Sequence, residues 1–295
     1  MLHFIEGFNL LIFALFTVFY AYQLFYVVAA LWHDRKRVPT PEAKKLHKFA
    51  AVISARNEST VIGELVHSIK KQNYPAELLD VFVIADNCTD NTAAVAERAG
   101  AIVFERFNRQ QVGKGYALDY AFQRIEKEYG QAQYEGYFIF DADNLLDANY
   151  VAEMNKVFDS GYRVITSYRN SKNFDSNWIS AGSALWFLRE AKFLNNSRMI
   201  LGTNCAVSGT GFLVASDVIR ARGGWKYHLL TEDIQFSIDC ACEGERVVYC
   251  STAMLYDEQP VTFEQSWNQR LRWSKGFYQV FAHYGKKLLG GVLKR

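Results

Sequence analysis

Two aspartates, Asp141 and Asp143, interrupt an apolar stretch that reads YFIFDADNLL over residues 137–146. Burying an unpaired carboxylate is costly, so such groups sit at an exposed strand end, pair with a cation or change their pKa. Carboxylate oxygens are the ligands that Mg²⁺ and Mn²⁺ prefer. The two acids are therefore a candidate site for a divalent cation, although two acids in a loop are more often simply solvated.

Acidic residues also follow two other apolar stretches. Glu58 comes after residues 49–55, and Asp86 ends residues 78–86. In a parallel sheet, ligands bind at the carboxyl ends of the strands. Acids at three strand ends would repel a diphosphate unless a divalent cation lay between them, which strengthens the metal-site interpretation.

The elements that would position these acids alternate between strands and helices. The intervening segments have helical spacing, and in one of them Asp90 is the expected N-cap. This order predicts an α/β fold with a parallel, doubly wound sheet. The four expected strands are FAAVISA (49–55), LLDVFVIAD (78–86), AIVFER (101–106) and YFIFDAD (137–143).

Two common nucleotide-binding motifs are excluded. A dinucleotide site needs G-x-G-x-x-G after the first strand, where the chain reads SARNES (54–59). A P-loop needs G-x-x-x-x-G-K-[ST]. The nearest match, Gly113-Lys114-Gly115, has Asn108 at the first glycine position and Gly115 at the Ser/Thr position. The predicted sheet therefore presents carboxylates to a ligand, not a glycine cradle.

The N-terminal segment predicts a membrane anchor. Residues 10–32 carry no charge and are long enough to cross about 30 Å of hydrocarbon as a helix. A cleaved signal peptide is the alternative, but there is no basic n-region and no A-x-A-like cleavage site. The positive-inside rule then places the chain beyond the span in the cytoplasm, at the cell membrane, because basic residues follow it: Arg35, Lys36, Arg37, Lys44, Lys45 and Lys48.

Composition sets further bounds. The 295 residues carry a net charge of +2, which gives no case for a nucleic-acid partner. The five cysteines are scattered and odd in number, which favours reduced thiols over a disulfide framework or a zinc site. We expect four parts: a transmembrane helix, a basic linker, an α/β domain that carries the candidate site, and a C-terminal amphipathic helix with its tail, at residues 1–32, 33–48, 49–260 and 261–295.

Over roughly residues 48–281 the chain resembles the family 2 glycosyltransferases, which have the GT-A fold. The likeness is strongest to the membrane-embedded branch that includes the cellulose, chitin, hyaluronan and poly-N-acetylglucosamine synthases. Each motif is weak alone, but seven occur in the family order: SARNE (54–58), DNCTDNT (86–92), GKGYAL (113–118), DAD (141–143), SGTG (208–211), TED (231–233) and QRLRW (269–273).

The resemblance implies an inverting transfer of a sugar from a UDP-sugar to an acceptor hydroxyl. Asp86 would accept the uracil imide N–H, with capping of the following helix as the alternative. Asp141 and Asp143 would hold Mg²⁺ or Mn²⁺, so that the diphosphate leaves as a neutralised anion. The residues implied to bind the donor are Ala55, Glu58, Asp86, Lys114 and Asp141.

On the acceptor side, the resemblance makes Asp233 the general base. The alternative is that the acids of TED only stabilise a helix through its dipole. The helix that carries QRLRW is amphipathic and could equally lie on the membrane. The residues implied to face the acceptor or the pyrophosphate are Gly209, Thr210, Glu232, Gln269, Arg272 and Trp273.

Three functions remain open on this basis. A polysaccharide-synthase type of enzyme is favoured, a single-sugar transferase acting on a lipid is the alternative, and an inactive membrane-anchored scaffold is the least favoured. Processive synthases need a bundle of transmembrane helices after QRLRW, and no second hydrophobic span follows Trp273 in the sequence. The terminal KKLLGGVLKR reads like the approach to such a span, which favours a longer native protein. The sequence does not identify the sugar.

Overall fold

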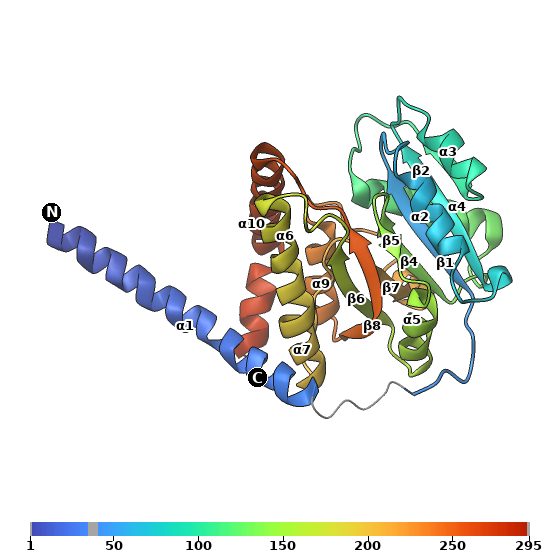
Figure 1. Ribbon diagram of the computed structural model, residues 1–295. Helices are drawn as coiled ribbons and strands as arrows, with labels where there is room; N and C mark the ends of the chain where they lie inside the picture. Colours follow the sequence, from blue (N-terminus) through green and yellow to red (C-terminus); the bar gives the residue numbers. More distant parts are fainter. Residues whose placement is uncertain (1, 35–40, 294–295) are drawn as a thin grey trace.

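An eight-stranded mixed sheet forms the centre of the computed structural model, which describes residues 2–34 and 41–293 (Figure 1). The strand order is β3-β2-β1-β4-β7-β6-β8-β5. The strands are β1 (Phe49–Ala55), β2 (Leu79–Asp86), β3 (Ile102–Arg106), β4 (Gly136–Asp141), β5 (Leu145–Leu146), β6 (Val164–Ser171), β7 (Phe212–Ala215) and β8 (Val247–Asp257).

The four strands expected from the sequence are parallel neighbours. β1 pairs with β2 and β4, and β2 pairs with β3, all in parallel. Ser54 lies opposite Asp141, and Asp86 lies opposite Arg106. The acidic strand ends therefore meet at one edge, as expected. Beyond β4 the sheet continues with β7, which runs antiparallel to both β4 and β6.

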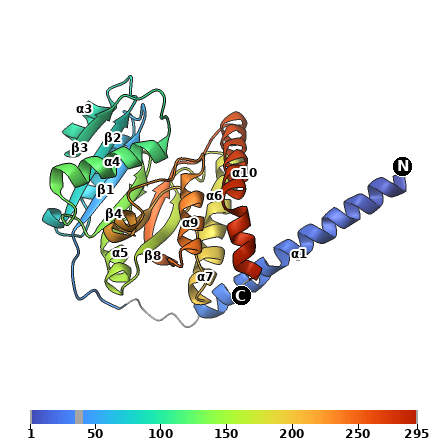
Figure 2. The ribbon, with the colours of Figure 1, turned by 180° about the vertical axis from the view of Figure 1, so that it is seen from behind.

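Helices cover both faces of the sheet (Figures 1 and 2). Alternate side chains of β1 point to opposite faces, so Ala50 and Val52 pack in one core and Phe49, Ala51 and Ile53 in the other. The first core takes α4 (Lys114–Tyr129), α8 (Ser216–Ala221) and α9 (Glu232–Cys242). The second takes α2 (Ile62–Lys70), α3 (Thr92–Arg98) and α5 (Tyr150–Asp159), and a short 3₁₀ turn, η1 (Ala76–Leu78), precedes β2.

The start of α3 differs from the expectation by one residue. Asn91, not Asp90, occupies the N-cap position. The Asp90 carboxylate instead accepts hydrogen bonds from the backbone N–H of Thr92 at 3.0 Å and from its hydroxyl at 2.5 Å. Asp90 thus supports the first turn of the helix from just outside it.

A second group of helices stands at the β6–β8 side of the sheet: α6 (Trp178–Arg189), a π-helical segment η2 (Glu190–Asn195), α7 (Asn196–Ile200) and α10 (Phe263–Leu293). From this side the long helix α1 (Leu2–Asp34) extends away from the rest of the molecule (Figures 1 and 2).

Helix α1 is long and apolar enough to cross a membrane. The most apolar 18-residue window within His3–Trp32 has a mean hydropathy of 2.0, and none of that window is buried. Its last turns pack against α7 and η2, where the Ser197 hydroxyl donates to the Tyr26 carbonyl at 2.5 Å. The basic residues Arg35, Lys36 and Arg37, on which the predicted orientation depends, lie outside the described residues.

Candidate active site

The DAD turn follows β4 and is held by backbone hydrogen bonds. The backbone N–H of Asp141 donates to the Thr210 hydroxyl at 2.9 Å and to the Asn144 side-chain oxygen at 3.1 Å. The side chain of Asn144 also receives the Thr210 hydroxyl. Thr210 is 3% exposed, and its hydroxyl is used in these two hydrogen bonds. The side chain therefore supports the turn, whereas the sequence predicted that it would face the acceptor or the pyrophosphate.

Lys114 lies among the acids of this edge. Its ammonium contacts the Asp141 carboxylate, donates to the Gly209 carbonyl at 2.7 Å and lies 3.9 Å from Glu232 Oε1. Burial alone would lower the pKa of Lys114, but the charges of Asp141, Glu232 and Asp233 outweigh it and raise that pKa. Lys114 is therefore a fixed cation in the site.

The glycine after Lys114 has a packing role. A methyl group added at Gly115 would lie 2.0 Å from the Tyr227 carbonyl oxygen, closer than any side chain can approach. Glycine at this position lets the start of α4 pack directly against the chain that leads into α9. The GKG sequence thus positions Lys114 beside the TED residues, and no P-loop is present there.

Asp233 and Asp141 both lie close to Gly209. A methyl group added at Gly209 would be 3.9 Å from Asp233 Oδ2 and 4.0 Å from Asp141 Oδ2. Burial raises the pKa of Asp233, although backbone N–H groups of Ile234 and Gly209 and the charge of Lys114 oppose the shift. Burial, with the charge of Asp233, raises the pKa of Glu232 to about 7.

This burial bears on the alternative for TED. A helix dipole can stabilise acids in the first turn while they stay in water, so that role alone does not require their burial. Asp233 and Glu232 are instead enclosed near Lys114 and Asp141. Burial raises the pKa of both carboxyl groups, a feature that is common at functional sites.

Asp86 forms a buried ion pair that the sequence did not reveal. Arg106 Nη1 donates to Asp86 Oδ1 at 2.6 Å, and Asn87 Nδ2 donates to the same oxygen at 3.0 Å. Arg106 also donates to the Gln111 carbonyl at 2.8 Å. Asp90 supplies the hydrogen bond at the start of α3, so the helix-cap alternative for Asp86 is wrong.

The other two residues predicted to bind the donor border the same edge. Ala55 is 1% exposed at the end of β1, so it can offer a ligand its backbone rather than its side chain. The backbone N–H of Glu58 donates to the Thr92 hydroxyl at 2.8 Å. Burial, followed by the charge of Asp141, raises the pKa of Glu58.

Asp143 meets the requirements of a metal ligand. Burial raises its pKa to about 8, with further contributions from the charges of Asp257 and Asp141. Such crowding of carboxyl groups favours a bound cation. Within residues 2–34 and 41–293 no three His, Cys, Asp or Glu side chains gather as a ready ligand set. Two carboxylates fit Mg²⁺ or Mn²⁺, which take one or two from the protein and oxygens from phosphates.

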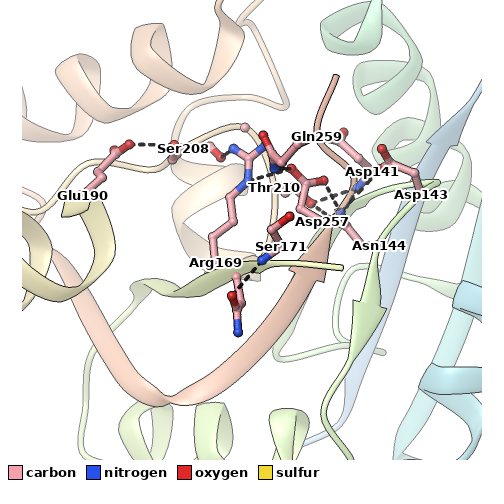
Figure 3. Close-up of polar contacts among 12 residues, drawn as sticks. Asp141, Asp143, Asn144, Arg169, Ser171, Glu190, Ser208, Thr210, Asp257 and Gln259 are labelled. Carbon is pink, nitrogen blue, oxygen red and sulfur yellow. Dashed lines mark hydrogen bonds and ion pairs between the residues drawn. The ribbon is translucent and has the colours of Figure 1, made fainter. Parts of the chain in front are cut away.

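A second buried ion pair, Arg169–Asp257, lies behind the DAD turn (Figure 3). Arg169 Nε is 2.9 Å from Asp257 Oδ2, and Asn144 Nδ2 donates to Asp257 Oδ1 at 2.9 Å. Neither charged residue belongs to a motif recognised in the sequence. Their pairing depends on the alignment of β6 with β8, which no local pattern reveals.

The QRLRW residues lie on α10, which packs on α9. A methyl group added at Gly276 would come within 2.5 Å of the Thr231 side chain, so this glycine lets α10 approach the TED motif. Trp273 packs edge-on against Phe187 of α6, with ring centroids 6.0 Å apart. Gln269 is half-buried and Arg272 is exposed.

A pocket of about 210 Å³ opens between α6 and α10, and its walls are mainly aromatic. It adjoins the QRLRW motif at Trp273. The lining residues are Ser183, Trp186, Phe187, Arg270, Trp273, Ser274 and Phe277.

Residues 47–276 match the family described as glycosyltransferase-like family 2. This chain belongs to that family. The beta-monoglucosyldiacylglycerol synthase of Synechocystis sp. is 25% identical over 257 residues, covering 85% of this chain and 51% of the relative. The poly-beta-1,6-N-acetyl-D-glucosamine synthase of Staphylococcus aureus is 24% identical over 261 residues, covering 87% and 61%. The chain thus spans about half to three fifths of these relatives.

Solved glycosyltransferases have the same fold. The mannosyltransferase PcManGT from Pyrobaculum calidifontis, in complex with GDP-Man and Mn²⁺, aligns with a TM-score of 0.68 at 19% identity, over 93% of this chain and 74% of that one. Staphylococcus aureus TarS 1-349, in complex with UDP, aligns with a TM-score of 0.56 at 18% identity, over 82% and 65%. These similarities confirm the expected GT-A fold, and the family match identifies a glycosyltransferase.

If Asp233 is the general base, transfer by this glycosyltransferase should fall as the pH is lowered, because a general base works only without its proton. Burial raises the pKa of Asp233, so the acid limb of the pH–rate profile should lie above the range of an ordinary aspartate. Glu232→Gln removes a neighbouring negative charge and should shift that limb to lower pH. We would measure kcat over roughly pH 5 to 9 for both proteins. If Glu232→Gln does not shift the acid limb of the profile, the coupling between Glu232 and Asp233 is contradicted.

Proposed function

We propose that this glycosyltransferase moves a sugar from a UDP-sugar to a hydroxyl group of a glycan acceptor at the cytoplasmic face of a membrane, with inversion at the anomeric carbon. The observation that supports the proposal is that Asp233 and Asp141 both lie close to Gly209, with Lys114 in contact with Asp141 and near Glu232. A proton acceptor and an edge that binds the diphosphate would then share one small space.

On the donor side, Asp86 would accept the imide N–H of the base. Both hydrogen bonds described above end on Oδ1, which leaves Oδ2 for a ligand. A carboxylate oxygen at this position can accept the hydrogen bond from the imide N–H. Lys114 would bind the diphosphate as a point charge.

Asp141 and Asp143 would hold a divalent cation, Mg²⁺ or Mn²⁺, which when bound neutralises charge on the leaving diphosphate. Asp233 would take the proton of the acceptor hydroxyl as that oxygen attacks the anomeric carbon. Glu232 lies next to Lys114 and would tune the charge around that base. Gly209, which cannot block the space with a side chain, lets acceptor and donor meet between the two aspartates.

The membrane face is proposed from the surface of the helices near α1. Helices α6 and α10 lie on the side of the sheet from which α1 departs (Figures 1 and 2). Exposed large apolar side chains on these two helices would rest on the lipid surface. They include Trp178, Leu185, Trp186, Trp267, Phe277 and Phe281.

A lipid acceptor is the second candidate, and the aromatic pocket between α6 and α10 favours it. Such a pocket could take part of a lipid tail beside Trp273. One of the two relatives is named as a diacylglycerol glucoside synthase and the other as a polysaccharide synthase, so their names do not decide between the acceptors.

The test is a transfer assay with purified protein in detergent and lipid. Radiolabelled UDP-sugars and GDP-sugars would be supplied with Mn²⁺, with Mg²⁺ or with EDTA. We expect label from UDP-sugars only, dependence on the metal, and product that stays in the aqueous phase as a glycan. Label in the organic phase as one sugar on a lipid would favour the second candidate. Transfer from a GDP-sugar alone would refute the proposed donor.

A further inference from the structure

We propose that Arg169 is a positioning residue that fixes the DAD turn and the SGTG loop relative to each other, with Asp257 as its anchor. The consequence for catalysis rests on the proposed function. The positioning itself is a property of the fold and can be measured without a substrate.

All three nitrogens of the Arg169 guanidinium contact groups of the protein. Nε and Nη2 bind Asp257 Oδ2, and Nη1 donates to the Ser208 carbonyl at 3.0 Å. The face of the group lies over the Phe187 ring, 3.7 Å from its centroid. The side chain is 14% exposed. These contacts tie Arg169 both to the end of β8 and to the SGTG loop.

The pairing of β6 with β8 places Arg169 near the site. The pairing of β6 with β8 shifts between Ser167 and Tyr168, so that Ser167 lies opposite Cys250 and Tyr168 opposite Met254. A bulge of this kind bends a strand and redirects the side chains that follow. Beyond the shift, Arg169 lies opposite Leu255, two residues before Asp257. The irregular register thus brings the two charges together.

Asp257 connects Arg169 to the DAD turn through hydrogen bonds. Its Oδ1 receives Asn144 Nδ2 at 2.9 Å, and its Oδ2 also receives Gln259 Nε2 at 3.0 Å (Figure 3). Asn144 in turn receives the backbone N–H of Asp141. One buried carboxylate, 2% exposed, therefore links Arg169 to the backbone of Asp141 through a single intermediate side chain.

Arg169 also reaches the SGTG loop and, through Phe187, helix α10. Ser208, whose carbonyl Arg169 binds, directly precedes Gly209, which lies close to both Asp233 and Asp141. The Phe187 ring that supports Arg169 packs against Trp273 of the QRLRW motif. A paired buried charge with satisfied hydrogen bonds can fix one arrangement of the surrounding segments, and here those segments carry the proposed metal ligands and the acceptor side.

The first test compares Arg169→Gln with Arg222→Gln by hydrogen exchange. Arg222 is a matched control because its side chain is also 14% exposed and its Nε lies 3.0 Å from a carboxylate, Asp239 Oδ2, outside the DAD–SGTG region. We expect Arg169→Gln to speed amide exchange at residues 141–144 and 208–211 by at least about tenfold, while Arg222→Gln leaves both segments unchanged. Unchanged exchange at both segments in a folded Arg169→Gln protein would overturn the proposal.

The second test measures UDP binding with Mn²⁺ and the kinetic constants of the same proteins. Arg169→Gln should weaken metal-dependent UDP binding and raise the acceptor KM, each by about tenfold or more, with partial recovery in Arg169→Lys. If Arg222→Gln shows the same losses, the effect is one of general stability and the positioning role is wrong. A wild-type protein that binds no UDP would refute the proposed donor alone, since the exchange result would still decide the role of Arg169.

Discussion

Asp233→Asn is expected to lower the transfer rate by about 10²- to 10⁴-fold, which is the range that a general base contributes. The amide cannot take the proton of the acceptor hydroxyl, so the oxygen would attack with its proton still attached. Because Asp233 is proposed to act on the acceptor and not on the metal or the diphosphate, the affinity for the donor nucleotide should stay close to that of the wild type. Single-turnover transfer with saturating donor measures the step that changes.

Glu232→Gln is the control for this variant. Glu232 lies next to Asp233 on α9, and its Oε1 is 3.9 Å from Lys114 Nζ. The substitution therefore removes a carboxylate from the same cluster without removing the proposed base. We expect a milder loss of rate than in Asp233→Asn. Equal loss in the two variants would mean that the charge of the cluster, and no particular base, sets the rate. No loss in either would place the base elsewhere and leave the helix-dipole account of TED standing.

Asp143→Asn should abolish transfer and weaken metal-dependent donor binding. Loss of an outer-shell partner of a metal costs roughly 10- to 100-fold in affinity, and loss of a ligand should cost more. The fold should survive, because the Asp143 carboxyl is crowded by Asp257 and Asp141 and its pKa is raised by burial. A neutral amide relieves that repulsion, so the melting temperature of the metal-free variant should equal or exceed that of the wild type.

Asp147→Asn is the control on the same segment. Asp147 accepts the backbone N–H of Asn149 at 3.0 Å, four residues beyond Asp143, and has no part in the proposed metal site. We expect wild-type dependence on Mn²⁺ in this variant. If Asp143→Asn also retains wild-type turnover with EDTA present, the metal assignment is wrong.

The fold and the positions of the acids could be predicted from the sequence for a clear physical reason. Strands buried on both faces must be apolar throughout, so an acid that ends such a run marks the edge of the sheet. Asp86, Asp141 and Asp143 could be placed in this way, and parallel pairing then brings them together. Lys114 was identified through the resemblance of GKGYAL (113–118) to a family motif.

The supporting charges could not be found in the same way. Arg106 and Arg169 lie on strands, where an arginine near the end is commonplace, and their partners are distant in sequence. The pairing of Arg106 with Asp86 needs the register of β2 with β3, and that of Arg169 with Asp257 needs the shifted register of β6 with β8. Thr210 is a different case, because its motif predicted a contact with the acceptor or the pyrophosphate. In the structure its side chain is buried and supports the DAD turn.

The central claim is that the Asp141–Asp143 side binds the donor while Asp233 acts on the acceptor. Calorimetric titration of UDP in the presence of Mn²⁺ tests it most directly, with the wild type, Asp143→Asn and Asp233→Asn measured side by side. We predict binding to Asp233→Asn that matches the wild type, and binding to Asp143→Asn that is greatly weakened. Loss of UDP binding in Asp233→Asn together with wild-type binding in Asp143→Asn would contradict this division of roles.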